Sequence, residues 1–224
     1  MVPGIAQARV PRQEQVPRLR GILHAVTFPL AVTAGVVLVV LAPTPLARLA
    51  AAVYAVTSAL LFGVSAAYHR GYWPGRTRDV LHRLDHADIY LIIAGTYTPL
   101  ALLALHGDVR VAVLAVIWTG AAAGAAFRVA WLGAPRWLYT LLYVVLGWTA
   151  VFVLPQLLRG AGAAALLLVL TGGILYSLGG LVYGMRRPDP CPRWFGFHEV
   201  FHALTVAAYI AQYVAVSLVV YRVT

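Results

Sequence analysis

The sequence predicts an all-α polytopic membrane protein, a bundle of seven transmembrane helices. Of its 224 residues, 62% are hydrophobic and only 11% are charged, whereas about a quarter of the residues of a soluble domain are charged. Seven apolar runs are long enough to cross a bilayer, which takes about 17 to 25 residues in a helix. Arginines gather in alternate connections between these runs, as expected of a protein with one fixed orientation in the membrane.

The predicted spans follow one another along the whole chain. The first is longer than the core of a signal peptide, so we interpret it as an uncleaved anchor. No internal repeat divides the chain, and one compact bundle is the simplest interpretation. The spans are expected at residues 22–42, 48–68, 86–106, 110–128, 136–155, 162–183 and 199–221.

The chain is predicted to consist of a short polar tail followed by the helical bundle. Residues 1–20 are polar and rich in arginine and proline, which predicts a disordered cytoplasmic tail. Residues 21–224 form the predicted seven-helix transmembrane domain. The single cysteine, Cys191, rules out an internal disulfide.

The arginines predict how the bundle is oriented. All 17 basic residues are arginine, and the formal net charge is +10. With a cytoplasmic N-terminus, only Arg48, Arg110, Arg159 and Arg222 lie outside, so the positive-inside rule places the N-terminus in the cytoplasm and the C-terminus outside. The distribution of arginines therefore indicates a multi-pass membrane protein in contact with the lipid bilayer, and no nucleic acid partner is expected.

Polar side chains within the spans are expected to face the bundle interior, because the bilayer core penalises them. His24, near the start of the first span, is expected at the membrane interface or in a hydrogen bond within the bundle. In the last span the polar residues recur at steps of four and three, which places them on one side of a helix. The polar faces comprise Ser58, Ser65 and His69 in the second span, His82, Asp85, His86, Asp88 and Thr96 in the third, and His198, His202, Thr205, Tyr209 and Gln212 in the last.

The predicted topology places several of these groups at one membrane depth. His69 ends the second span on the inside, Asp85 begins the third there, and His198 begins the last. His106 ends the third span on the outside, so it is excluded from this cluster.

The segment "FHEVFH", residues 197–202, contains H-E-x-x-H, a zinc-binding signature of metalloproteases. A catalytic zinc takes three protein ligands and water, but no His, Asp, Glu or Cys follows Ala203. A common zinc protease is therefore disfavoured, and the third ligand must lie upstream. Spacing alone leaves the choice open among His24, His69, His82, Asp85, His86, Asp88 and Cys191.

Three motifs carry a resemblance to a known family. They are "SAAYH" (residues 65–69), "LHRLDHADIYLIIAGTYTP" (81–99) and "FHEVFH" (197–202), set in seven spans. In this order and spacing the chain resembles the progestin and adipoQ receptor family, in its bacterial haemolysin III-type branch. The long N-terminal domain of the animal receptors has no counterpart here, so hormone recognition is not implied.

The resemblance implies a Zn²⁺ ion held by His69, His198 and His202. It further implies that Asp85 holds the water that zinc activates and that Ser65 contributes a supporting hydrogen bond. In the animal receptors of this family the site is linked to ceramide hydrolysis, whereas the bacterial branch is named for a haemolytic activity. A membrane lipid or other fatty acyl compound is thus the expected substrate.

These features lead to a hypothesis with several alternatives. The main hypothesis is a zinc-dependent hydrolase acting on a lipid amide or ester. A closed zinc site could instead only tie the second, third and last spans together, and a membrane sensor could use such a site. A haemolysin-type pore is the other alternative, but the sequence shows no ring of like charges and no evident broken span. Glu199 could serve as a general base, although a carboxylate in the first turn of a helix is also favoured by the helix dipole.

Overall fold

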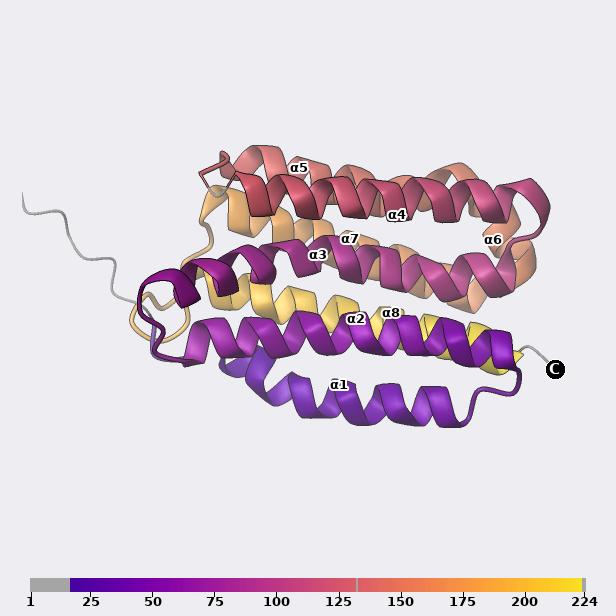
Figure 1. The fold of residues 1–224 in the computed structure, drawn as a ribbon, viewed down its shortest axis with the longest axis horizontal. Coiled ribbons are helices and arrows are strands. Elements are labelled where there is room, and N and C mark those ends of the chain that lie inside the picture. The colour runs from indigo at the N-terminus through magenta and orange to yellow at the C-terminus, as the bar shows by residue number, and fades with distance from the viewer. Residues whose placement is uncertain (1–16, 132, 223–224) are drawn as a thin grey trace, which may run out of the picture.

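The computed structural model describes residues 17–131 and 133–222, which form a bundle of long helices lying side by side (Figure 1). Within these ranges the regular secondary structure is helical, apart from an isolated bridge between Cys191 and Phe195. Seven helical segments are long and apolar enough to cross a membrane, which confirms the predicted all-α multi-pass fold. They are α1 (Ile22–Val40), α2 (Pro45–Arg70), α3 (Gly75–Ala104), α4 (Gly107–Ala130), the fifth span (Arg136–Ala161), α7 (Ala163–Met185) and α8 (Phe197–Arg222).

The third span begins earlier than its apolar run. Helix α3 starts at Gly75, after an extended Pro74, and not near residue 86 as predicted. Polar residues can continue a helix beyond the hydrocarbon region, because the backbone hydrogen bonds do not depend on hydrophobic side chains. Asp85 therefore lies in the third turn of α3, and not in its first.

The fifth span is interrupted, which corrects the expectation that no span is broken. Helix α5 (Arg136–Gly147) passes into a 3-10 segment, η1 (Trp148–Val153), before α6 (Leu154–Ala161) completes the span. Backbone groups freed by such a break must find other partners in a membrane. The hydroxyl of Tyr97 on α3 supplies them, donating to Gly147 O at 2.7 Å and accepting from Ala150 N at 2.5 Å.

Helix α3 is the central element of the bundle. Its apolar window is 72% buried, against 17% to 28% for α1, α4, α7 and the fifth span. It packs on α2, α4, α6 and α8. Gly95 lets α2 approach α3 closely, because a Cβ at this position would meet the side chain of Thr57. This contact brings the helix that carries His69 against the helix that carries Asp85.

The segment before α1 is tied to the loop before α8. Residues 1–16 of the predicted tail lie outside the described residues, whereas residues 17–20 contact that loop. The backbone N–H groups of Arg18 and Leu19 donate to the carbonyl oxygens of Arg193 and Trp194, each at 3.1 Å. These four residues are thus part of the fold. The cytoplasmic location of this end stays a prediction from the arginines.

Candidate metal centre

Three histidines from two helices converge at one end of the bundle. His69 lies in the last turn of α2, and His198 and His202 lie in the first two turns of α8. One candidate ligand atom from each of the three lies within 4.8 Å of the others. We call these residues the histidine triad. The structure therefore brings together the three ligands that the resemblance implied.

The spacing of the ring nitrogens suits a metal ion. Nε2 of His198 lies 3.2 Å from Nε2 of His69. Two nitrogens bound to one tetrahedral zinc at 2.0 to 2.1 Å are about 3.3 Å apart. Nδ1 of His202 is buried and lacks a hydrogen-bond partner among the described residues, so this ring has a nitrogen free to act as a ligand. The histidine triad could thus hold a metal ion, and its three nitrogen donors fit zinc.

The start of α8 is held in place by Glu199. One carboxylate oxygen accepts a hydrogen bond from the N–H of Gly196 at 2.8 Å, just before the helix begins. The other accepts from Nε of Arg20 at 2.5 Å, and the Glu199 side chain is 1% exposed. Both oxygens are therefore engaged in fixing the helix start. This geometry favours the interpretation of Glu199 as a helix-terminal carboxylate over that of a general base.

Asp85 and Ser65 lie beside the histidine triad. Oδ2 of Asp85 is 3.6 Å from Nε2 of His69 and 3.7 Å from Nδ1 of His86. At these distances Oδ2 is not hydrogen-bonded to either ring, so it can still accept a hydrogen bond from another group. Ser65, one turn before His69 on α2, is 2% exposed and lines the same cavity as Asp85. The predicted positions of both residues are thus compatible with holding water near the metal.

The second histidine pair, His82 and His86, does not join the histidine triad. The His82 ring stacks on Tyr68 with centroids 5.4 Å apart and an angle of 15°. Nε2 of His86 lies 3.2 Å from the hydroxyl of Tyr183, and its Nδ1 lies 3.0 Å from the carbonyl oxygen of His82. Both rings therefore have aromatic or hydrogen-bonding neighbours of their own.

The remaining candidates for the third ligand also lie apart from the triad. Asp88 is 3% exposed, and its Oδ2 has no partner in the part of the chain that the structure describes. Cys191 is exposed in the loop before α8. His106, which the topology excluded, precedes α4 and lines a separate hollow with Arg159 and Gly160.

His24 is the nearby residue whose position was not predicted. It was expected at the interface or in a hydrogen bond, yet it is 2% exposed and its ring lies flat on that of His202, with centroids 3.7 Å apart. The argument from membrane depth could have found it, because the first span begins at the same end of the bundle as the last. Its neighbours could not be found that way, since they depend on how α1 packs against α8.

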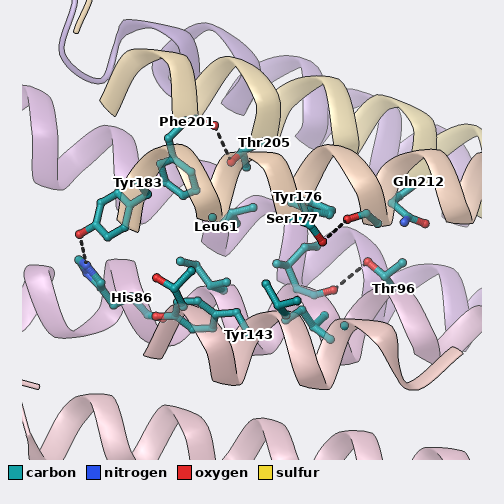
Figure 2. Close-up of a pocket in the computed structure, with 18 of the residues that line it drawn as sticks. Leu61, His86, Thr96, Tyr143, Tyr176, Ser177, Tyr183, Phe201, Thr205 and Gln212 are labelled. Atoms are coloured by element: carbon teal, nitrogen blue, oxygen red, sulfur yellow. Dashed lines mark hydrogen bonds between the residues drawn. The ribbon is translucent and has the colours of Figure 1, made fainter. Parts of the chain in front are cut away.

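A cavity of about 130 Å³ leads from the histidine triad into the bundle. His24, Ser65 and Asp85 line one end, and Thr96 and Gln212 line the other. Figure 2 shows His86 and Tyr183 at one end of this pocket and Thr96 and Gln212 at the other. From His198 to Gln212 the helix rises about 21 Å, at 1.5 Å per residue. The cavity between these levels is lined mainly by aliphatic and aromatic side chains, among them Leu61, Leu100, Tyr143 and Val169.

Comparison with known proteins links this arrangement to one family. A model of the haemolysin-III related family matches residues 12–213. Hemolysin-3 of Bacillus cereus is 34% identical over 165 residues, which cover 72% of this chain and 75% of the relative. The Hemolysin-3 homolog of Bacillus subtilis (strain 168) is 30% identical over 159 residues, which cover 71% of this chain and 72% of the relative.

Proposed function

The chain belongs to the haemolysin-III related family, within the progestin and adipoQ receptor family that its motifs resemble, and from this premise we propose that it is a zinc-dependent hydrolase of lipid amides or esters. The observation that carries the proposal is a group of three histidines, one fewer than the four ligands of a tetrahedral zinc, at one end of an apolar cavity. His69, His198 and His202 supply three donors, and a catalytic zinc takes three protein ligands with one position left for water.

The bound ion would supply a Lewis acid that activates water and polarises the acyl carbonyl group. His69, His198 and His202 would hold it, and Asp85 would orient the attacking water and accept its proton. Ser65, which lines the same cavity as Asp85, would contribute a supporting hydrogen bond that keeps Asp85 in the orientation this role requires. In the net reaction the amide or ester bond breaks, the acyl carbon gains the water oxygen, and the leaving amine or alcohol gains a proton.

The cavity would bind the acyl chain of the substrate. Its lining is mainly aliphatic and aromatic, and it extends from the histidine triad to the level of Gln212. An apolar chain that leaves the bilayer for such a cavity stays in an apolar surrounding, so the reacting carbonyl can reach the polar end at little cost. The substrate is therefore expected to be a membrane lipid whose acyl chain lies along α3 and α8.

The test is hydrolysis by the purified protein reconstituted in lipid, with and without zinc. Ceramides, lysolipids and acyl esters would be offered, and fatty acid release measured by mass spectrometry. Release that requires zinc and falls sharply in Asp85→Asn supports the proposal. Zinc-loaded, correctly folded protein that releases no fatty acid from any member of the panel contradicts it and favours a zinc site that only ties helices together.

A pore is the second candidate, and one observation favours it. The fifth span is interrupted at η1 beside the cavity, and the relatives carry the name Hemolysin-3. The same reconstituted protein in dye-loaded liposomes distinguishes the two functions. Dye release that is unaffected by zinc removal or by Asp85→Asn favours the pore, whereas intact liposomes with fatty acid release favour the hydrolase.

A further inference from the structure

His24 has an unusual environment for a buried histidine. It lies in the first turn of α1, is 2% exposed, and lines the cavity at the end where Ser65 and Asp85 are found. Neither of its ring nitrogens has a hydrogen-bond partner among the residues that the structure describes. The described chain thus leaves both polar atoms of this ring without a partner.

Two other rings pack against the His24 ring. One face lies on His202, with centroids 3.7 Å apart and planes 9° from parallel. Phe62 packs against it nearly at right angles, with centroids 5.1 Å apart. His24 is not in the group of mutually close ligand atoms formed by the histidine triad. It therefore lies next to the metal ligands without being one of them.

Packing alone does not account for an imidazole at this position. A buried polar group without a hydrogen bond costs about 1 to 3 kcal/mol, and phenylalanine or leucine would cover His202 without that cost. The neutral imidazole carries one N–H donor and one acceptor nitrogen. A ligand in the cavity with an oxygen acceptor would remove the cost by accepting from the N–H group.

We propose that His24 is a ligand-binding residue whose N–H group donates a hydrogen bond to an oxygen atom of an acyl group in the cavity, a carbonyl or carboxylate oxygen. The inference deepens the proposed function and rests on it only in taking an acyl lipid as the occupant. Because His24 lies beside His202, this hydrogen bond would hold the polar end of the lipid next to the metal ligands.

The backbone before His24 is held firmly enough for this role. Gly21 has a φ angle of 75°, and a Cβ at this position would lie 2.5 Å from Cβ of His69. Any other residue would therefore be strained and would collide with the triad. Arg20 is bonded to Glu199 on α8. The start of α1 is thus hydrogen-bonded to α8 and packed closely against α2, the two helices that carry the triad. These contacts fix the position of the His24 backbone.

The test measures binding of palmitate, a fatty acid with a carboxylate, to the zinc-loaded full-length protein in detergent. Radiolabelled palmitate and scintillation proximity give its affinity, and zinc content and the midpoint of thermal unfolding are measured in parallel without lipid. His24→Phe keeps an aromatic ring on His202 and removes both nitrogens. It is expected to keep its zinc, to be at least as stable as the wild type without lipid, and to bind palmitate about 10- to 100-fold more weakly.

A matched pair of variants guards against a folding defect. The side chains of His24→Asn and His24→Leu each have four non-hydrogen atoms with the same branching, but only that of Asn carries an N–H donor, so Asn is expected to bind palmitate more tightly. His82→Phe makes the same exchange at a histidine outside the cavity lining and is expected to bind as the wild type does.

Three results would overturn the inference: equal affinity of His24→Asn and His24→Leu, loss of zinc in His24→Phe, or no palmitate binding by the wild type. Failure of the proposed function gives a different result. In that case the wild type binds palmitate in a manner that depends on His24, yet hydrolyses no lipid.

Discussion

Two histidine pairs with the same spacing have different surroundings in this protein. His198 and His202 on α8 and His82 and His86 on α3 are each separated by four residues, which places both rings of a pair on one side of a helix. The pair on α8 meets His69, and the three offer ligand atoms within 4.8 Å of one another. In the pair on α3, His82 stacks on Tyr68 and His86 lies within hydrogen-bonding distance of the Tyr183 hydroxyl.

The difference shows what determines a metal site in a helical bundle. Spacing along one helix sets the direction of the side chains, but a third donor must come from a neighbouring helix at the same level. On α8 that donor is His69, and Glu199 fixes the helix start through Gly196 and Arg20. Asp85 lies between the two groups, at 3.6 Å from His69 and 3.7 Å from His86. Substitutions on either side should therefore have unequal effects.

The largest effect is expected from removing one member of the triad. His202→Ala should lower zinc affinity by more than about 100-fold, since even the loss of an outer partner of a ligand costs 10- to 100-fold. Unfolding should also occur at a lower temperature, because metal binding contributes to folding free energy. Zinc content by mass spectrometry and thermal unfolding in detergent measure both. His82→Ala is the matched control and should keep its zinc; equal zinc content in the two variants would remove the distinction between the pairs.

The next effect concerns the carboxylate between the pairs. Asp85→Asn should slow fatty acid release by about 10² to 10⁴-fold, the usual contribution of a general base, while zinc remains bound to the triad. Asp88→Asn, three residues further along α3, provides the control and should keep a rate close to that of the wild type. A comparable loss of rate in both variants would show that acidic character in this region, and not the position of Asp85, is what matters.

A smaller effect is expected at the helix start that supports the α8 pair. Glu199→Gln weakens the contact with Arg20 and should reduce the free energy of unfolding by about 2 kcal/mol, as expected for hydrogen bonds to a charged group. Denaturation in urea measures the change, and the hydrolysis rate per bound zinc should stay close to that of the wild type. Unchanged stability with a large loss of rate would instead assign Glu199 the general base role.

The smallest effect is expected on the α3 side. Tyr183→Phe removes the hydroxyl that lies 3.2 Å from Nε2 of His86, which should cost about 1 kcal/mol of unfolding free energy. Zinc content should be unchanged, because Tyr183 and His86 have no part in the triad. Loss of zinc in Tyr183→Phe would mean that the two pairs are coupled more strongly than their separate neighbours indicate.

Much of this arrangement follows from hydrophobicity and membrane depth. Apolar runs of sufficient length identify spans, because a bilayer leaves the backbone few alternatives to a helix. Depth then brings His69, Asp85 and His198 to one level, and the resemblance to a known family selects His69 among several possible third ligands.

Other features depend on contacts between distant segments and could not be predicted. The break at Trp148 in the fifth span is stabilised by the hydroxyl of Tyr97, a residue about fifty positions earlier. The early start of α3 lies in a polar stretch without an apolar signal. The stack of His24 on His202 requires the packing of α1 against α8, which neither helix specifies alone.

The most direct test of the metal centre is X-ray absorption at the zinc edge of the purified, zinc-loaded protein. Three imidazole nitrogens and one oxygen at about 2.0 to 2.1 Å are expected, because three histidines leave one position of a tetrahedral ion open. The number of imidazoles should fall to two in any His202→Ala protein that retains zinc. A wild-type spectrum with fewer than three imidazoles, or with sulfur from Cys191 among the ligands, would contradict a centre built from His69, His198 and His202.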